Sequence, residues 1–244
     1  MIAQVQAELL KIRSTRTTLG LVAGMVALIV LFALLTGLLT KAPHLTTPED
    51  QRGLLNIGSI AGLFSALAGV MLITSEYRHG TIRPTFLFDP RRSQVLAAKA
   101  IAGLLAGAAF GVVGEALGFG IGYLTLSARG IPFALTTAQA ALMLGGGLAA
   151  VALWAVIGIA VGAIVRNQVG TIIGLLAWGL IIDSLLFAFM PSVGRFSPNQ
   201  AENALEGLTT KHLLPAAAGA AVLIAWAAAL TIAGILATAR RDVT

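Results

Sequence analysis

Six long apolar runs alternate with short polar segments along the chain. They cover Leu19–Leu39, Leu54–Thr74, Val95–Leu126, Ala138–Val165, Val169–Met190 and Leu213–Thr238. Continuous apolar runs of about 20 residues are typical of membrane-spanning helices, whereas the strands of a barrel would be shorter and alternating. The third and fourth runs are longer than a bilayer requires, so we expect them to tilt or to project beyond it. The pattern predicts an all-α membrane protein with six transmembrane helices in a single domain, residues 1–244.

The N-terminal polar segment, residues 1–18, is predicted to be an amphipathic helix that lies on the membrane surface. Apolar residues recur at helical spacing on one face: Ile2, Val5, Leu9 and Ile12. Polar groups next to that face come from Glu8, Lys11 and Arg13. Such a helix buries its apolar side in the boundary between lipid headgroups and acyl chains. The alternative is that these residues are an ordinary basic flank of the first span.

Three further polar segments complete the predicted organisation. Residues 41–53 contain two prolines and an acidic pair, and we read them as an irregular loop. Residues 75–94 form a basic cytoplasmic loop between the second and third spans. Residues 191–212 form an extracellular segment, in which a short helix starts at about Pro198 and is too polar to cross the membrane. We expect that helix to end near Leu208 and to lie at the outer surface.

The 16 Lys and Arg residues predict which side of the membrane each loop faces. If both termini are cytoplasmic, eleven of them fall on the cytoplasmic side and five outside. The five outer residues are Lys41, Arg52, Arg129, Arg195 and Lys211. Cytoplasmic loops carry an excess of Lys and Arg, so this bias predicts that both termini lie in the cytoplasm.

Composition excludes several classes of function. The chain is 57% hydrophobic and only 11% charged, whereas a soluble domain carries roughly 25% charged residues. Its net charge of +6 is divided among short loops, so we predict no binding of nucleic acid. There is no cysteine, the three histidines lie in separate loops, and no metal site is expected. No lysine follows a glycine, as a phosphate-binding loop requires, and we predict neither catalytic residues nor a cofactor in this chain.

Glycines recur at intervals of three or four residues in three of the spans. They are Gly103, Gly107, Gly111, Gly114, Gly118 and Gly122 in the third span, Gly158 and Gly162 in the fourth, and Gly170 and Gly174 in the fifth. Small residues at this spacing allow helices to pack closely. The alternative is that they make gating helices flexible.

Two acidic residues lie within predicted spans, Glu115 in the third and Asp183 in the fifth. Both spans run outward in the predicted topology, so the two acids should lie at similar depths in the outer half of the membrane. An ionisable group in a span costs at least about 2.5–3.5 kcal/mol on insertion scales, and such groups face a polar cavity or a partner. Both are therefore candidates for the pathway of a cationic or polar substrate. The alternative is a protonated structural acid at a helix contact.

The basic loop at residues 75–94 combines charge with an apolar patch. Pro84 and Pro90 interrupt any continuous helix, and residues 86–88 between them are Phe, Leu and Phe. A short element of this kind suits insertion into a groove on a soluble partner. The alternative is an anchor that follows the positive-inside rule and carries aromatic residues at the membrane interface.

Two stretches of the sequence carry a resemblance to a known family. The first consists of Glu8, Leu9, Leu10, Lys11, Ile12 and Arg13. The second consists of Glu76, Tyr77, Arg78, His79, Gly80, Thr81, Ile82 and Arg83, followed by Pro90, Arg91, Arg92 and Lys99. Together with the six spans, they resemble the ABC-2 type transporter permeases, the membrane subunits of one class of ATP-driven exporters. The resemblance covers essentially the whole chain, and Pro84 departs from it because the helix is expected to continue there.

The resemblance implies an architecture and a function. Residues 1–18 would form the connecting or elbow helix, and the eight residues from Glu76 to Arg83 would dock on a separate ABC nucleotide-binding ATPase subunit, which binds ATP and Mg²⁺. A second permease copy, identical or related, would complete the substrate pathway in a bacterial cytoplasmic membrane, in contact with membrane lipids. The expected cargo is a drug or antibiotic, a lipid-like molecule or a peptide, as in multidrug efflux.

Two other functions stay open at this point. The first is a proton-coupled secondary transporter that uses Glu115 or Asp183 as its relay, and it predicts activity without a partner ATPase. The second is a non-transporting membrane component, such as an immunity or assembly protein, and it predicts partner binding without substrate flux.

Overall fold

The computed structural model of the protein describes residues 1–81 and 92–240. This part of the chain is helical and contains no strand. Six of its helical segments are long and apolar enough to cross a membrane: Arg16–Leu39, Pro48–Arg78, Ser93–Ala128, Thr137–Val165, Gln168–Phe189 and Ala216–Thr238. They agree with the six predicted spans to within a few residues, except that the second begins earlier. The prediction of an all-α protein of the multi-pass membrane type is confirmed.

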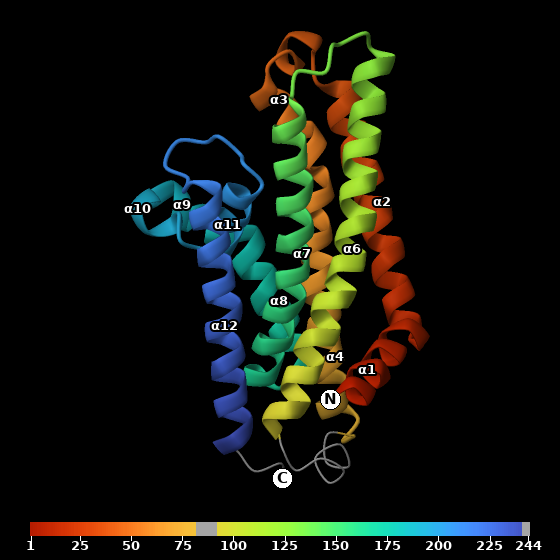
Figure 1. Ribbon diagram of the computed structural model, residues 1–244, viewed down its shortest axis with the longest axis vertical. Helices are drawn as coiled ribbons and strands as arrows, with labels where there is room; N and C mark the ends of the chain where they lie inside the picture. Colours follow the sequence, from red (N-terminus) through yellow and green to blue (C-terminus); the bar gives the residue numbers. More distant parts are fainter. Residues whose placement is uncertain (82–91, 241–244) are drawn as a thin grey trace.

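The spans form an elongated bundle (Figure 1). Its long helices are α2 (Arg16–Leu39), α4 (Ile60–Arg78), α6 (Arg92–Ala128), α7 (Thr137–Val165) and α12 (Ala216–Arg240). The fifth span consists of α8 (Gln168–Ala177), the π-helical turn η3 (Trp178–Ile182) and α9 (Asp183–Phe189). One end of the bundle carries α1 (Ile2–Ser14) and the other carries α3 (Pro48–Leu55), so we refer to the α1 end and the α3 end.

Helix α7 lies at the centre of the bundle, where it contacts α4, α6 and α12. Its buried Trp154 and Ile157 pack in one core with Ala66 of α4 and Leu223 of α12. Within the most apolar stretch of each span, 61% of the residues are buried in α7 but only 11% in the fifth span. Most side chains of the fifth span therefore lie on the outside of the bundle. Apolar side chains are stable there in contact with lipid or with another chain.

Glycines bring α4, α6 and α7 into close contact, as the sequence predicts for the third and fourth spans. A Cβ atom on Gly158 would collide with the backbone of Ala66. Gly118 of α6 and Gly58, in the 3₁₀ turn η2 (Asn56–Ser59), approach each other in the same way. In the fifth span the glycines do not pack on another helix of the described residues, because none of its atoms lies within 4 Å of a Cβ built on Gly170 or Gly174.

Helix α1 is separated from α2 by Thr15, whose extended backbone (φ −90°, ψ 132°) interrupts the helical hydrogen bonds. The residues of the predicted apolar face differ in their burial in the structure. Val5 and Ile12 are half-buried, whereas Ile2 is 78% exposed. The side that meets α4 and α6 passes through Glu8, which is buried. The packing of α1 is thus centred on a charged residue.

Residues 41–53 are not an irregular loop, and that interpretation is wrong. They form the 3₁₀ helix η1 (Ala42–Leu45) and the start of α3. Thr47 caps α3, because its Oγ1 accepts a hydrogen bond from the backbone N–H of Asp50 at 3.2 Å. Pro48 follows at the first helical position, where a missing N–H costs nothing. The two prolines therefore start short helices here instead of preventing them.

Gln51 of α3 holds the α3 end together. Its side-chain amide donates to the carbonyl oxygens of Leu45 at 2.9 Å and Pro132 at 2.8 Å. Its oxygen accepts from the backbone N–H of Ala134 at 2.8 Å. The side chain is completely buried, and its three hydrogen bonds join the two connections at this end of the bundle.

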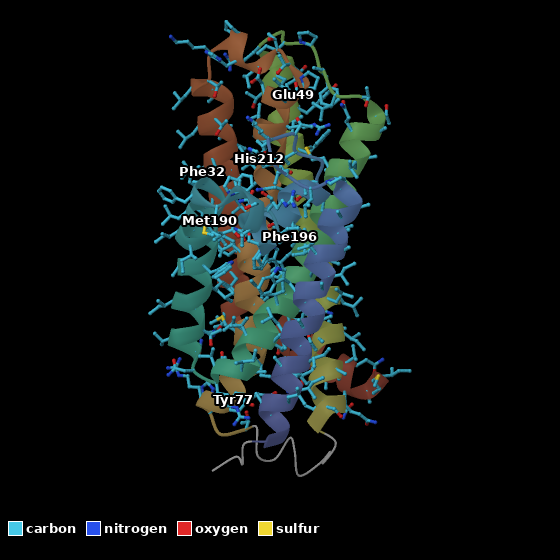
Figure 2. The ribbon with its side chains drawn as sticks, turned by 90° about the vertical axis from the view of Figure 1, so that its left-hand side faces the viewer. Phe32, Glu49, Tyr77, Met190, Phe196 and His212 are labelled. Carbon is cyan, nitrogen blue, oxygen red and sulfur yellow. The ribbon has the colours of Figure 1, made fainter. Side chains whose placement is uncertain are left out.

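The segment between the fifth and sixth spans folds back into the molecule. Its helices are α10 (Pro191–Gly194) and α11 (Pro198–Leu205), so the predicted start at Pro198 is confirmed. Met190, Phe196 and His212 lie between Glu49 and Tyr77 along the long axis, short of the α3 end (Figure 2). Helix α11 packs on α7 and α12, and five of its eight residues are buried. This burial differs from the expectation of a polar helix at the outer surface.

Candidate functional site

Four charged side chains meet at the α1 end, and we call them the four-charge cluster. Glu8 and Lys11 come from α1, Glu76 from the end of α4, and Lys99 from the first turns of α6. The ammonium nitrogen of Lys99 lies 2.9 Å from the Glu8 carboxylate and 2.7 Å from that of Glu76. The ammonium of Lys11 lies 3.0 Å and 2.8 Å from the same two carboxylates. Each cation therefore bridges α1 and α4.

The formal charges of the cluster cancel, which makes its burial tolerable. Lys99 is completely buried, and Glu8 and Glu76 are only 6% and 5% exposed. A buried ion is stable only where partners replace its hydration, and here each cation has two carboxylates. The side chain of Lys11 is half-exposed. Burial opposes its charge, but hydrogen bonds to Glu76 and Glu8 outweigh this effect, so the pKa of Lys11 is raised above its ordinary value.

The predicted docking residues differ in their exposure. Glu76 is buried in the four-charge cluster, so its carboxylate is not on the surface. Arg78, His79, Gly80 and Thr81 follow it and are exposed. Ile82 and Arg83 lie outside the described residues. Of the predicted elbow residues, Glu8 and Lys11 join the cluster while Arg13 is exposed. Of the docking residues that the structure describes, those exposed to a partner thus form the segment 78–81, with Glu76 beneath it.

Tyr77 connects this region to two more helices. The guanidinium carbon of Arg166 lies 5.4 Å from the centre of the Tyr77 ring, within the range of a cation–π contact. Arg166 also donates a hydrogen bond to the carbonyl oxygen of Ala237 in α12, at 2.9 Å. Arg166 ends α7 with a left-handed backbone (φ 58°). The end of α4 is therefore attached to α1, α6, α7 and α12.

The two acids predicted within spans belong to a second group, which we call the membrane acid cluster. Besides Glu115 and Asp183, it contains Glu202 and Glu206 of the α11 segment. Glu202 interacts electrostatically with both Glu115 and Asp183, and Glu206 interacts with Glu115. All four are buried, with Asp183 and Glu206 completely so. The structure thus brings the two predicted acids to the same segment.

Three of these acids accept one hydrogen bond each from a neutral donor. Asn56 Nδ2 donates to Glu206 Oε2 at 2.6 Å. The indole N–H of Trp154 donates to Glu202 Oε2 at 2.7 Å. Gln200 Nε2 donates to Asp183 Oδ2 at 2.9 Å. Within residues 1–81 and 92–240, the second oxygen of each acid has no hydrogen-bond partner, and neither has either oxygen of Glu115.

Glu115 occupies space that a glycine leaves open. A Cβ atom on Gly147 would collide with Oε1 of Glu115, so the carboxylate lies directly against the backbone of α7 at this glycine. The guanidinium of Arg52 lies against Gly207, next to Glu206, but no ion pair within 4 Å joins it to an acid of the described residues. In the same part of the chain, no three His, Asp or Glu side chains are arranged to hold a metal ion. The four acids therefore lack a cationic partner there.

Sequence reasoning missed Glu202, Glu206 and the buried role of Lys99. The two glutamates are four residues apart, so they project from the same side of a helical segment. That spacing, close to spans that contain acids of their own, is the pattern from which a shared cluster could be predicted. The polar composition of the segment 191–212 favours an exposed position instead. Burial of α11 depends on its fit against α7 and α12, which the local sequence does not encode.

Comparison with known proteins finds no match: no protein-family model and no curated protein matches the chain. The geometry of the two clusters is therefore the basis for a functional proposal.

Proposed function

We propose that the chain is the permease subunit of an ATP-driven exporter of the ABC-2 type. In this proposal it docks on a separate nucleotide-binding ATPase subunit through the segment that ends α4. A second copy or a related permease completes the substrate pathway. The protein lies in a bacterial cytoplasmic membrane with both termini in the cytoplasm. ATP and Mg²⁺ are bound by the ATPase subunit, and this chain has no catalytic site of its own.

The four-charge cluster is the observation that carries the proposal. A docking segment has to transmit a movement of its partner to the spans. A loosely attached loop would move alone and leave the spans in place. Here the exposed segment 78–81 follows Glu76, which is ion-paired to Lys99 of α6 at 2.7 Å and to Lys11 of α1 at 2.8 Å. Displacement of the segment would therefore move three helices together. A solvated loop without a partner would not need this buried attachment.

The resemblance to ABC-2 permeases supports the same assignment from a different direction. Its most specific stretch starts at Glu76, the residue that is buried beneath the exposed segment. The exposed residues Arg78 and His79 present basic and hydrogen-bonding groups to a soluble partner. An acidic or polar groove on the ATPase subunit would complement them.

The test is to co-express the chain with the ATPase encoded by a neighbouring gene and to substitute Arg78→Glu. Arg78 is exposed, so charge reversal should leave the fold intact. Lys41→Glu is the matched control, because it reverses another exposed charge at the α3 end. We expect Arg78→Glu to reduce co-purification of the ATPase and transport-coupled ATP hydrolysis by about tenfold or more, as loss of a charged interface contact does. Lys41→Glu should change neither.

Two results would overturn the proposal. One is normal ATPase capture and coupled hydrolysis by the Arg78→Glu variant. The other is equal loss in both variants, which would mean that a general change of charge, and not the segment 78–81, is responsible. Melting temperatures of both variants in detergent report whether either substitution disturbs the fold.

The membrane acid cluster favours a second candidate, a proton-coupled secondary transporter. Four buried acids without a cationic partner in the described residues could bind and release protons during transport. This candidate predicts substrate flux into vesicles that contain the chain alone and are driven by a pH gradient. Flux that requires the ATPase and ATP, and that persists when a protonophore collapses the gradient, excludes it.

A further inference from the structure

A cavity of about 350 Å³ lies between α4, the fifth span and α11. Such a volume is at the lower end of the range for small-molecule sites. Aliphatic side chains of α4 and the fifth span line one part of it, including Leu63 and Leu180. Polar side chains of α11, Asn199, Gln200 and Asn203, line another part. The cavity thus has an apolar wall and a polar wall, as sites for amphipathic molecules do.

Among the described residues that line this cavity, Glu202 is the one that carries a carboxylate. One of its oxygens, Oε2, accepts the indole N–H of Trp154, another lining residue. The other oxygen, Oε1, is buried and has no hydrogen-bond partner. Gly62 leaves room for this pair, because a Cβ built there would lie 3.0 Å from the Trp154 ring and 3.3 Å from Oε1. Glu202 therefore lies at the cavity wall with one carboxylate oxygen held by Trp154 and the other enclosed beside Gly62.

The neighbouring groups make a positive ligand favourable. Asp183 and Glu115 both interact electrostatically with Glu202, and all three are at least nine-tenths buried. Every ion pair among the described residues belongs to the four-charge cluster at the α1 end, so none compensates these acids. In a low-dielectric site, a bound cation next to Glu202 would favour the ionised form of its carboxylate, which burial and the neighbouring acids disfavour. The Trp154 ring adds an aromatic surface for the same ligand.

The π-helical turn gives the cavity a further polar feature. A π turn interrupts the regular helical hydrogen-bond pattern and often occurs at functional sites. The carbonyl oxygen of Gly179, in η3, accepts a hydrogen bond from Asn199 Nδ2 at 2.9 Å. This bond attaches α11 to the fifth span directly beside the cavity. The wall that carries Glu202 is therefore held in position.

We infer that this cavity binds a cationic amphiphile, an apolar molecule with one protonated amine, through the carboxylate of Glu202. The inference rests on the proposed function and names the substrate class of that permease. The ammonium group donates to the Glu202 carboxylate, and the apolar part lies against Leu63, Leu180 and Trp154. Neutral molecules of the same shape lack the charge that compensates the acids, and they bind more weakly.

The test measures binding of dansylcadaverine, a fluorescent amphiphile with a primary amine, to the purified chain in neutral lipid nanodiscs. Its N-acetyl derivative has the same fluorophore and nearly the same shape but no charge. The test variant is Glu202→Gln, whose amide oxygen still accepts the Trp154 indole N–H. The matched control is Glu49→Gln, which removes an exposed acid of α3. A second variant, Ser184→Phe, fills the cavity from an exposed position and does not touch the acids.

We expect the chain to bind dansylcadaverine about tenfold or more tightly than the N-acetyl derivative, because a hydrogen bond to a charged group is lost in the latter. Glu202→Gln should remove that preference, Glu49→Gln should keep it, and Ser184→Phe should weaken both probes. Equal affinity for both probes in the unsubstituted chain, or an unchanged preference in Glu202→Gln, would overturn the inference. Since the ATPase is absent, failure here is independent of the docking proposal. Arg78→Glu should bind dansylcadaverine normally.

Discussion

Substitution of Lys99 by Met tests whether the four-charge cluster holds α1, α4 and α6 together. Lys99 is completely buried, and its ammonium lies within 3 Å of two carboxylates. Methionine fills a similar volume without charge, so it leaves Glu8 and Glu76 with Lys11 as their only cation. Removing one partner of a buried ion pair costs about 3–5 kcal/mol, because the remaining charge stays buried and uncompensated. We expect Lys99→Met to lower the free energy of unfolding by that amount.

A double-mutant cycle separates this electrostatic effect from a simple loss of packing. The Glu8→Gln and Lys99→Met pair restores neutrality, because Glu76 and Lys11 still form their 2.8 Å ion pair. The combined loss should therefore be smaller than the sum of the two single losses by about 1–3 kcal/mol. The measurement is unfolding in mixed micelles by titration with a denaturing detergent, at the same ionic strength for every variant.

Lys11→Met serves as the comparison within the same cluster. The side chain of Lys11 is 48% exposed, so water can partly replace its charge and Lys11→Met should cost less than Lys99→Met. The reasoning fails if Lys99→Met costs no more than Lys11→Met. It also fails if the losses in the Glu8 and Lys99 cycle are additive within about 0.5 kcal/mol.

Two further substitutions test the packing of the bundle. Gly158→Ala should destabilise the protein by about 1–3 kcal/mol, because the new methyl group meets the backbone of Ala66. Gly145→Ala on the same helix has open space around it and should not destabilise the protein. A similar melting temperature for both variants would contradict the close contact at Gly158. Gln51→Leu should lower the free energy of unfolding by about 3 kcal/mol, because the three hydrogen bonds of a buried side chain are lost. Glu49→Gln, on the exposed side of α3, should change it by no more than about 0.5 kcal/mol. Thermal unfolding in detergent is the measurement, and a loss below about 1 kcal/mol for Gln51→Leu would refute the role of Gln51.

Hydropathy predicts the spans well because the membrane imposes a simple length and composition on every crossing helix. The same reasoning is weakest at the polar connections, where local chemistry decides. Thr47 and Pro48 form a capping signal that starts α3, yet the nearby prolines suggested an irregular loop. Gly170 and Gly174 have the spacing of packing glycines but do not pack on a neighbouring helix of this chain. The spacing of small residues indicates that a helix face can pack closely on another helix. It does not indicate whether another helix lies against that face.

The candidate sites could be predicted only in part, for a related reason. Glu115 and Asp183 are conspicuous because acids are rare in spans, and both belong to the membrane acid cluster. The resemblance predicts Glu8 in an elbow helix and Glu76 in a docking segment, but it does not predict that Lys99 pairs with both. Their burial results from contacts between residues that are up to 91 positions apart. The pattern of a single sequence gives no sign of such pairs, so the network behind the proposed function is visible only in the three-dimensional structure.

The two clusters are joined by the same helices. Helix α6 carries Lys99 and Glu115, which a straight helix places about 24 Å apart. Helix α4 carries Glu76 at one end and continues at the other into η2, where Asn56 donates to Glu206 at 2.6 Å. A shift of these two helices, imposed at the α1 end, would therefore reach the acids and the cavity beside Glu202.

Such a connection becomes coupling only if the two states of the bundle differ in their affinity for the ligand. With the ATPase bound, the affinity for dansylcadaverine should then depend on the nucleotide. Arg78→Glu, which detaches the ATPase, should abolish that dependence and leave the basal affinity unchanged. A nucleotide effect that survives in this variant would mean that the ATPase acts on the cavity by a route other than the segment 78–81.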